Sequence, residues 1–298
     1  MSPIFLKYPK SGGFRGLIKK DSMSDRLLFG TGGTPHSSKS ESTADGIERI
    51  AELGLGCMEV EFVYGANMNQ AMARKVGETA KSLNVKLSAH GPYYINLNAH
   101  EEEKLIASKK RLIQTARIAS TIGAQGIVFH PAFYLKDPPD EVYAKVKSGL
   151  EDTIKSMRDE GVQVTLRAET TGKGSQFGSL EEVLRLSAEI DGIAPCIDFA
   201  HLHAREGKSN SYEEFKAILK QIDDKLGRNA LNDMHIHLSG IKYSIKGELS
   251  HLNLGESDMN YPELFKAWKE FDIKGLVICE CPSLEADALI MQKVYNSL

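Results

Sequence analysis

Histidine and acidic side chains stand at the ends of successive apolar segments of this 298-residue chain. His90 and His130 each follow one apolar run, Glu169 and Asp198 follow the next two, and Glu280 follows the last. Imidazole and carboxylate groups crowded into one place cost on the order of several kcal/mol unless something neutralises them. A divalent cation does so, and this donor set is typical of zinc, with manganese or iron as alternatives.

Further histidines extend the pattern toward the C-terminus. His201 lies three residues after Asp198, and His251 follows the pair His235 and His237. Residues two apart on a strand face the same side, so periodicity leaves open which member of that pair is a ligand. The candidate ligands, about eight, exceed the roughly four that one ion requires, so the sequence predicts two or three ions.

The apolar runs that position these residues alternate with amphipathic, helix-like segments. The runs are Arg26–Gly30, Cys57–Phe62, Val85–Ala89, Gly126–Phe129, Val162–Ala168, Ile193–Ile197, Met234–Leu238 and Lys274–Cys279. They recur about every 30–40 residues, which is the repeat of a βα unit. We therefore predict an α/β fold, a (β/α)8 TIM barrel in a single domain, whose strands present their C-terminal ends on one face.

A doubly wound open sheet is the competing fold. The glycine-rich segment Gly30–Gly33 is not followed by a helix start, so a dinucleotide-binding sheet is disfavoured. Two helix starts are marked by capping boxes, in which a serine precedes a glutamate by three residues. These are Ser179 with Glu182 and Ser211 with Glu214.

We divide the chain into an N-terminal extension, residues 1–25, and the barrel, residues 26–298. The extension lacks the continuous apolar core of a signal peptide. No stretch approaches the roughly 18 apolar residues of a membrane-spanning helix.

The cysteines do not suggest a disulfide framework in a chain of this length, and we expect buried, reduced thiols in a cytoplasmic protein. They are Cys57, Cys196, Cys279 and Cys281.

The composition is that of an ordinary globular protein. The chain has 37 lysine and arginine residues and 40 aspartate and glutamate residues, which gives a net charge of -3. Its hydrophobic content of 41% is sufficient to form a core. The small acidic excess argues weakly against non-specific binding to nucleic acid, although bound cations would change the local sign. The basic cluster Lys104, Lys109, Lys110 and Arg111 is either a solvated helix face or a phosphate track.

Taken together, these motifs resemble the endonuclease IV family of apurinic/apyrimidinic endonucleases, most closely an archaeal-type branch of it. That family lies within the xylose-isomerase-like TIM barrels. The resemblance runs from about Leu27 to the C-terminal helix. The motifs that carry it are His90–Leu97, His130-Pro131, Glu169–Gly178, Cys196–His201, His237-Leu238, His251–Glu256 and Ile278–Glu280.

The resemblance implies a DNA-repair hydrolase that holds three zinc ions. The implied ligands are His90, His130 and Glu169 for the first ion; Glu169 again with Asp198, His237 and Glu280 for the second; and His201 with His251 for the third. The family cleaves the phosphodiester on the 5′ side of abasic sites in DNA, and its metals activate a hydroxide and stabilise the phosphate. Glu169 and Glu280 would be the catalytic residues, with Glu280 orienting the nucleophile.

Three positions depart from the family pattern. Leu249 stands where the family usually has an aspartate ligand of the third ion, and the nearest acid is Glu248. The third ion is therefore held by Glu248, weakly bound, or absent. The segment 64–69 lacks the arginine that the family inserts into DNA, and the segment 237–240 lacks the usual Asn-Asp pair.

The pair Tyr93-Tyr94 matches the place where the family inserts a tyrosine and an apolar neighbour into the duplex. Its alternative interpretation is a pair of ordinary loop aromatics. The expected partner is double-stranded DNA with abasic sites, and a monomer is expected. The expected cofactor is Zn²⁺, two or three ions, with Mn²⁺ as the alternative metal.

Two other functions compete with the nuclease. A single-metal sugar isomerase or epimerase needs only Glu169, Asp198, His237 and Glu280, which leaves the other histidines unexplained. A metal-binding protein without catalytic activity is the third possibility, and no feature of the sequence favours it.

Overall fold

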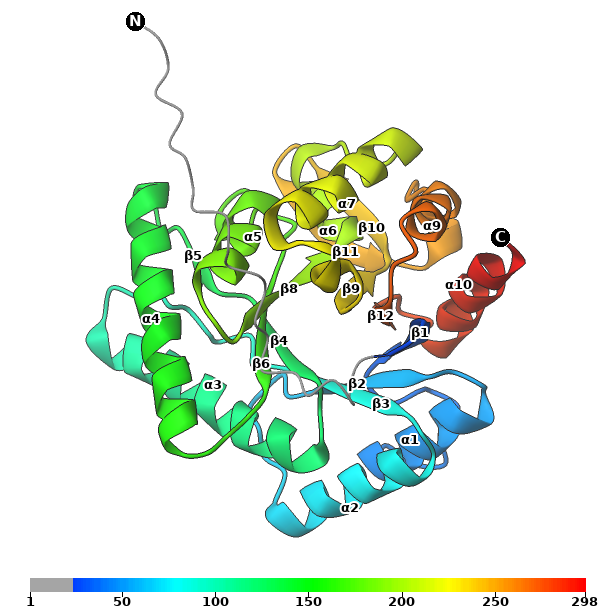
Figure 1. Cartoon of the computed structure of the whole chain (residues 1–298), viewed down its shortest axis with the longest axis horizontal. Coiled ribbons are helices and arrows are strands. Elements are labelled where there is room, and N and C mark those ends of the chain that lie inside the picture. Colours follow the sequence, from blue (N-terminus) through cyan, green and yellow to red (C-terminus); the bar gives the residue numbers. More distant parts are fainter. Residues whose placement is uncertain (1–23) are drawn as a thin grey trace, which may run out of the picture.

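The computed structural model describes residues 24–298, and residues 1–23 of the predicted N-terminal extension lie outside the described part. Within it, eight parallel strands close into a barrel in the order β1-β2-β3-β4-β6-β8-β9-β12. They are β1 (Leu27–Gly32), β2 (Cys57–Glu61), β3 (Lys86–His90), β4 (Gly126–Phe129), β6 (Thr165–Glu169), β8 (Ile193–Asp198), β9 (Met234–Leu238) and β12 (Gly275–Cys279). The predicted TIM barrel is confirmed (Figure 1).

The strands are buried on both faces, which explains their nearly continuous apolar composition. Side chains that point outward pack against the surrounding helices, whereas alternate side chains point into the barrel. Each predicted run matches one strand. The largest difference is at the fifth run, where β6 begins three residues later because Val162 still closes helix α4 (Pro139–Asp159) through a backbone bond to Met157.

Helices cover the outside of the barrel (Figure 1). Besides α4 they are α1 (Thr43–Glu52), α2 (Gln70–Ser82), α3 (Glu102–Ile122), α5 (Leu180–Glu189), α6 (Phe199–Glu206), α7 (Tyr212–Leu226), α8 (Arg228–Leu231), α9 (Tyr261–Glu270) and α10 (Glu285–Ser297), with a 3-10 turn, η2 (Leu254–Glu256). The predicted capping box is present at α5, where the Glu182 backbone N–H donates to Ser179 and the Ser179 backbone N–H donates to Glu182. Such caps satisfy backbone groups that the first helical turn leaves unpaired.

Two small antiparallel pairs stand apart from the barrel, and the sequence did not indicate them. One joins β5 (Ala132–Phe133) to β7 (Gln176–Phe177). The other is the hairpin of β10 (Gly240–Ser244) and β11 (Gly247–Leu252), which follows β9. Both lie in segments that follow the C-terminal ends of barrel strands, so they elaborate the face on which barrel enzymes carry their sites.

The main hydrophobic core lies between the barrel and its helices. The four cysteines are buried and free of disulfides, as predicted. The barrel interior also holds charged groups: Arg167 is fully buried and pairs with Asp233 at 2.7 Å. Gly126 leaves room for it, because a side chain there would meet the Arg167 Nε. No helix in the described part of the chain combines the length and apolar composition needed to span a bilayer.

Candidate metal centre

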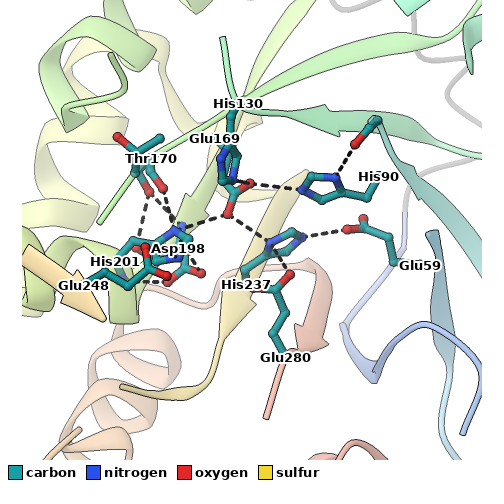
Figure 2. A network of polar contacts seen from close by, with 12 residues as sticks. Glu59, His90, His130, Glu169, Thr170, Asp198, His201, His237, Glu248 and Glu280 are labelled. Carbon is teal, nitrogen blue, oxygen red and sulfur yellow. Dashed lines mark hydrogen bonds and ion pairs between the residues drawn. The ribbon is translucent and has the colours of Figure 1, made fainter. Parts of the chain in front are cut away.

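The predicted ligands converge at the C-terminal end of the barrel. His90, Glu169 and Asp198 are the last residues of β3, β6 and β8, and His237 is the last but one of β9. Because parallel strands end on one face, side chains from distant parts of the chain meet there (Figure 2). The register supports this arrangement, since Asp198 lies directly beside His237.

Glu169 lies at the middle of the cluster and divides it with its two carboxylate oxygens (Figure 2). Its Oε2 is 2.7 Å from His130 Nε2 and 3.3 Å from His90 Nε2. Its Oε1 is 3.2 Å from His237 Nδ1 and 3.3 Å from His201 Nδ1. A carboxylate whose two oxygens face different sets of imidazoles has the geometry of a bridging ligand between two cations.

A second group shares Glu169 with the first. The donor atoms of Glu169, Asp198, His237 and Glu280 all lie within 4.8 Å of one another, as do those of His90, His130 and Glu169. Glu280 contributes Oε1, which is 3.3 Å from His237 Nδ1. These two groups contain the residues that the resemblance to the endonuclease IV family implied as ligands of the first and second ions.

A third group comprises His201 on α6 together with His251 and Glu248 on β11. The two imidazole Nε2 atoms are 3.3 Å apart, and Glu248 Oε2 is 3.5 Å from His201 Nε2. Two nitrogens bound tetrahedrally to one zinc ion at about 2.0–2.1 Å are separated by roughly 3.3 Å. Asp198 also lies within reach of this pair.

A β-bulge explains why Glu248, and not Leu249, faces this group. In the hairpin, Ser250 pairs with Lys242 whereas Glu248 pairs with Tyr243, so Leu249 is the extra residue. An extra residue in one strand shifts the alternation of side chains by one position. Residues three apart, Glu248 and His251, therefore share a face, and Leu249 is 56% exposed.

The loop after β6 is shaped to receive Glu248. Gly172 has no side chain there, and a Cβ at that position would lie 2.7 Å from the Glu248 Cβ. The Glu248 backbone N–H donates to the Gly172 carbonyl. Arg205 on α6 fixes the same loop by donating to the carbonyl oxygens of Thr171, Lys173 and Gln176.

Burial and charge act against each other in the cluster. Burial opposes protonation of His90, but Glu169 and Glu61 outweigh it and raise its pKa to about 10. Burial also opposes ionisation of Glu280, yet His237 lowers its pKa to about 2. Burial dominates at Asp198 and raises its pKa to about 6. The carboxylates thus favour positive charge at the imidazoles, which a divalent cation would supply in place of protons.

The donor set fits a divalent metal. The groups that converge are imidazole nitrogens and carboxylate oxygens, the ligands preferred by zinc. Glu61 Oε1 is buried and accepts no hydrogen bond from the described residues, which leaves a carboxyl oxygen beside the cluster without a partner. His90, His130, Glu169, Asp198, His201, His237, Glu248, His251 and Glu280 would hold the metals.

Comparisons with known proteins place the fold. Residues 47–295 match the family model of the xylose isomerase-like TIM barrel. The chain belongs to this family. An uncharacterized protein of Methanocaldococcus jannaschii is 45% identical over 273 residues, which are 91% of this chain and 98% of that protein.

Relatives with a stated function are more distant. A probable endonuclease 4 of Geobacillus sp. is 28% identical over 160 residues, and the chain spans about half the length of that relative, 51% of each chain being matched. The endonuclease IV structure from Thermus thermophilus aligns with a TM-score of 0.66 at 19% identity, covering 91% and 98% of the two chains. A D-tagatose 3-epimerase-like protein aligns with a TM-score of 0.68 at 17% identity, covering 90% and 96%. At these sequence identities, both structural alignments establish the shared fold and not a shared activity.

This xylose isomerase-like barrel also has two acidic residues at the centre that the sequence analysis missed, Glu59 and Glu61 on β2. Burial raises the pKa of Glu61 to about 8. The sequence analysis treated Cys57–Phe62 as an apolar run and gave no role to the two glutamates that alternate with Met58 and Val60. In the closed barrel the face that carries them points inward. Acidic residues at alternate positions of a predicted barrel strand were the available signal.

The remaining histidines have structural contacts. His235 lies below the centre and donates to Glu59, so His237 is the member of the pair that reaches the candidate ligands. His203 is buried between the Lys208 carbonyl and Asp258.

Tyr93 and Tyr94 lie on the loop after β3, beside the centre. They are 57% and 60% exposed, and the Tyr93 ring centroid is 5.9 Å from that of His90. Tyr94 carries the Arg111 guanidinium at 5.9 Å from its ring centre. A groove beside them is lined by Lys104, Arg111, Phe133 and Leu135 as well.

Proposed function

We propose that the protein is a zinc-dependent endonuclease that hydrolyses the phosphodiester on the 5′ side of abasic sites in double-stranded DNA. The observation that carries this proposal is the placement of Glu169 between two sets of imidazoles. A single-metal enzyme has no use for the pair His90 and His130 on the far side of that carboxylate. Phosphodiester hydrolysis uses such a multi-metal arrangement, because charge develops on both the attacking and the leaving oxygen.

Bound at this centre, divalent metals would supply Lewis acidity and a nucleophile that is active at neutral pH. The chain's own residues would arrange the substrate around them. Glu169 would hold the two halves of the centre at a fixed separation. Glu280, whose pKa is lowered by His237 in spite of burial, stays ionised and is placed to accept a hydrogen bond from the nucleophile.

The rim of the barrel supports a nucleic-acid substrate. Tyr93 and Tyr94 offer exposed rings beside the centre, and stacking of a base on an aromatic ring contributes about 1–3 kcal/mol. Tyr64, which is 84% exposed on the loop after β2, is a further ring on this face. Lys104 and Arg111 line the same groove, where Lys104 also pairs with Glu101, and Lys109 is paired with Asp152 on α4. Part of the basic cluster therefore faces the proposed path of the DNA backbone.

The test is incision of an end-labelled duplex that contains one tetrahydrofuran abasic analogue. We expect zinc-loaded protein to cut 5′ to the analogue and leave a 3′-hydroxyl that a DNA polymerase extends. A chelator should abolish cutting and added zinc should restore it. The undamaged duplex of the same sequence is the control. Failure of the metal-loaded protein to incise the analogue would contradict the proposal.

A single-metal sugar epimerase is the second candidate. The set Glu169, Asp198, His237 and Glu280 is complete without the other ligands, which favours this alternative. The two functions differ in metal content. More than one zinc per chain in elemental analysis supports the nuclease, and a single tightly bound ion with turnover of a keto-sugar supports the epimerase.

A further inference from the structure

Glu59 on β2 is fully buried and lies beside His237, with its carboxylate pointing toward that ring (Figure 2). Its Oε2 accepts hydrogen bonds from Ser88 at 2.7 Å and from His235 Nε2 at 2.9 Å. Its Oε1 lies 2.9 Å from His237 Nε2. Neither Oε1 nor His237 Nε2 has an aligned hydrogen-bonding partner among the described residues, so their 2.9 Å approach is an ion-pair contact. The Cys196 thiol also lies beside His235 and His237, within 4.8 Å, and Glu59 Oε1 is the carboxylate oxygen at His237 Nε2.

This contact decides which nitrogen of His237 faces the centre. Its Nδ1 points to Glu169 and Glu280, at 3.2 and 3.3 Å. A carboxylate oxygen at the opposite nitrogen favours a proton on Nε2, because a lone pair there would be repelled by the anion. The lone pair of Nδ1 is then free to bind a cation.

His90 and His251 use backbone carbonyls at the far nitrogen, whereas His201 Nδ1 lies near a carbonyl and also 3.3 Å from the carboxylates of Asp198 and Glu169. His90 Nδ1 lies 2.8 Å from the Gly91 oxygen, His201 Nδ1 3.0 Å from that of Thr170, and His251 Nδ1 3.2 Å from that of Glu280. His237 differs because it lies within β9, between β8 and β12, where backbone carbonyls are used in the sheet. A side chain from across the barrel takes their place.

We propose that Glu59 is a positioning residue of the metal centre, which fixes the tautomer and orientation of His237 so that Nδ1 binds the cation. This inference rests on the proposed function only in requiring a divalent metal at His237. Ser88 and His235 hold the carboxylate in place. Carboxylate partners of metal-bound histidines typically contribute 10–100-fold to metal affinity.

The first experiment measures zinc affinity of the full chain by competition with a chromophoric chelator. Glu59→Gln keeps the shape but removes the negative charge and one of the two acceptor oxygens that face His235 and His237. We expect zinc to bind the affected site about 10–100-fold more weakly. The cobalt-substituted variant should show shifted d–d absorption bands, because the orientation of one ligand changes.

Two matched variants separate this role from a general loss of stability. Asp233→Asn breaks the buried Arg167 ion pair without touching Glu59, and should lower stability while leaving zinc affinity within about threefold of wild type. Ser88→Ala removes one contact of Glu59 but leaves Oε1 at His237, so it too should have a small effect. Unchanged zinc affinity and cobalt spectrum in folded Glu59→Gln would overturn the inference.

A measurement on the wild type avoids dependence on the folding of a variant. In zinc-loaded protein labelled with ¹⁵N-histidine, long-range NMR correlations report the tautomer of each ring. We expect His237 to carry its proton on Nε2, and a proton on Nδ1 would overturn the inference. If Glu59→Gln loses zinc as expected but the wild type fails to incise abasic DNA, the inference stands and the proposed function fails. Absence of zinc binding by the wild type would overturn both.

Discussion

Glu169 is the residue on which the candidate centre depends. It is almost fully buried, and four imidazoles surround its two oxygens. Burial opposes its ionisation, yet His130 and His237 lower its pKa well below the ordinary value. A charged carboxylate at this point binds cations on both sides, whereas a neutral group binds neither strongly.

Glu169→Gln should therefore abolish incision and reduce metal content. The amide keeps the size of the side chain but loses the charge that joins the two ligand sets, and we expect at least about a hundredfold loss of activity. Activity on the abasic duplex and zinc per chain are the two measurements. Glu141→Gln, on the exposed surface of α4, is the control. Full activity in Glu169→Gln would show that the ligand assignment is wrong.

Glu248 owes its role to the bulge at Leu249. Glu248→Gln should weaken zinc binding at the pair His201 and His251, because the carboxylate beside His201 loses its charge. Adding Leu249→Asp in the same chain should fail to restore binding, since Leu249 points away from the pair. Titration of both variants with zinc measures this. Recovery in the double variant would contradict the assigned face of β11.

At the scale of elements, rigid strands hold the ligands while the loops after them form the rim. Tyr93 and Tyr94 follow β3 directly, so their rings are placed by the same strand that ends at His90. Arg111 on α3 ties this loop down by donating to the Tyr94 carbonyl. If Tyr93 and Tyr94 contact the substrate, their rings would therefore be held at a fixed position relative to the metal centre.

Tyr93→Ala should weaken binding to the abasic duplex without changing metal content. Loss of one stacked ring corresponds to about 1–3 kcal/mol, or roughly a 5- to 150-fold rise in Kd. Fluorescence anisotropy with labelled duplex measures the affinity. Ile290→Ala, an exposed apolar residue on α10, serves as the comparison. Equal affinity for wild type and Tyr93→Ala would make Tyr93 an ordinary loop residue.

At the scale of the molecule, the barrel concentrates acidic side chains at one end. Glu59, Glu61, Glu169, Asp198 and Glu280 approach one another there, although the whole chain carries a net charge of only -3. Cations at the mouth would therefore reverse the local sign and favour a polyanionic substrate.

Removal of metal should destabilise the fold. Ligands that bind the folded state at about 100 times their Kd contribute about 2.7 kcal/mol, so chelation should lower the Tm by several degrees. Calorimetry with chelator, and again after added zinc, measures the shift. Glu169→Gln should show a much smaller response to zinc. A Tm in wild type that is indifferent to chelator and zinc would argue against a structural contribution of the metals.

Much of this organisation was predictable from the chain alone. The eight strands follow from apolar runs at βα spacing, and the helix start at Ser179 follows from its capping box, because both depend on neighbours in sequence. The residue types at strand ends predicted a metal centre, since parallel strands must present those ends on one face. Neither inference required knowledge of which residues touch.

Only the closed barrel decided the rest. Glu59 and Glu61 lie at the centre because one face of every strand in a closed barrel points into the interior. The sequence of β2 alone does not show whether its acidic face points to solvent or into a barrel. Strand periodicity left the choice between His235 and His237 open, and the family resemblance favoured His237. The structure gives the physical reason, because His235 bonds Glu59 whereas His237 reaches Glu169 and Glu280. Glu248 reached His201 through a bulge whose register is set by pairing with β10. Each of these outcomes depends on contacts between residues far apart in sequence, so local pattern could not specify them.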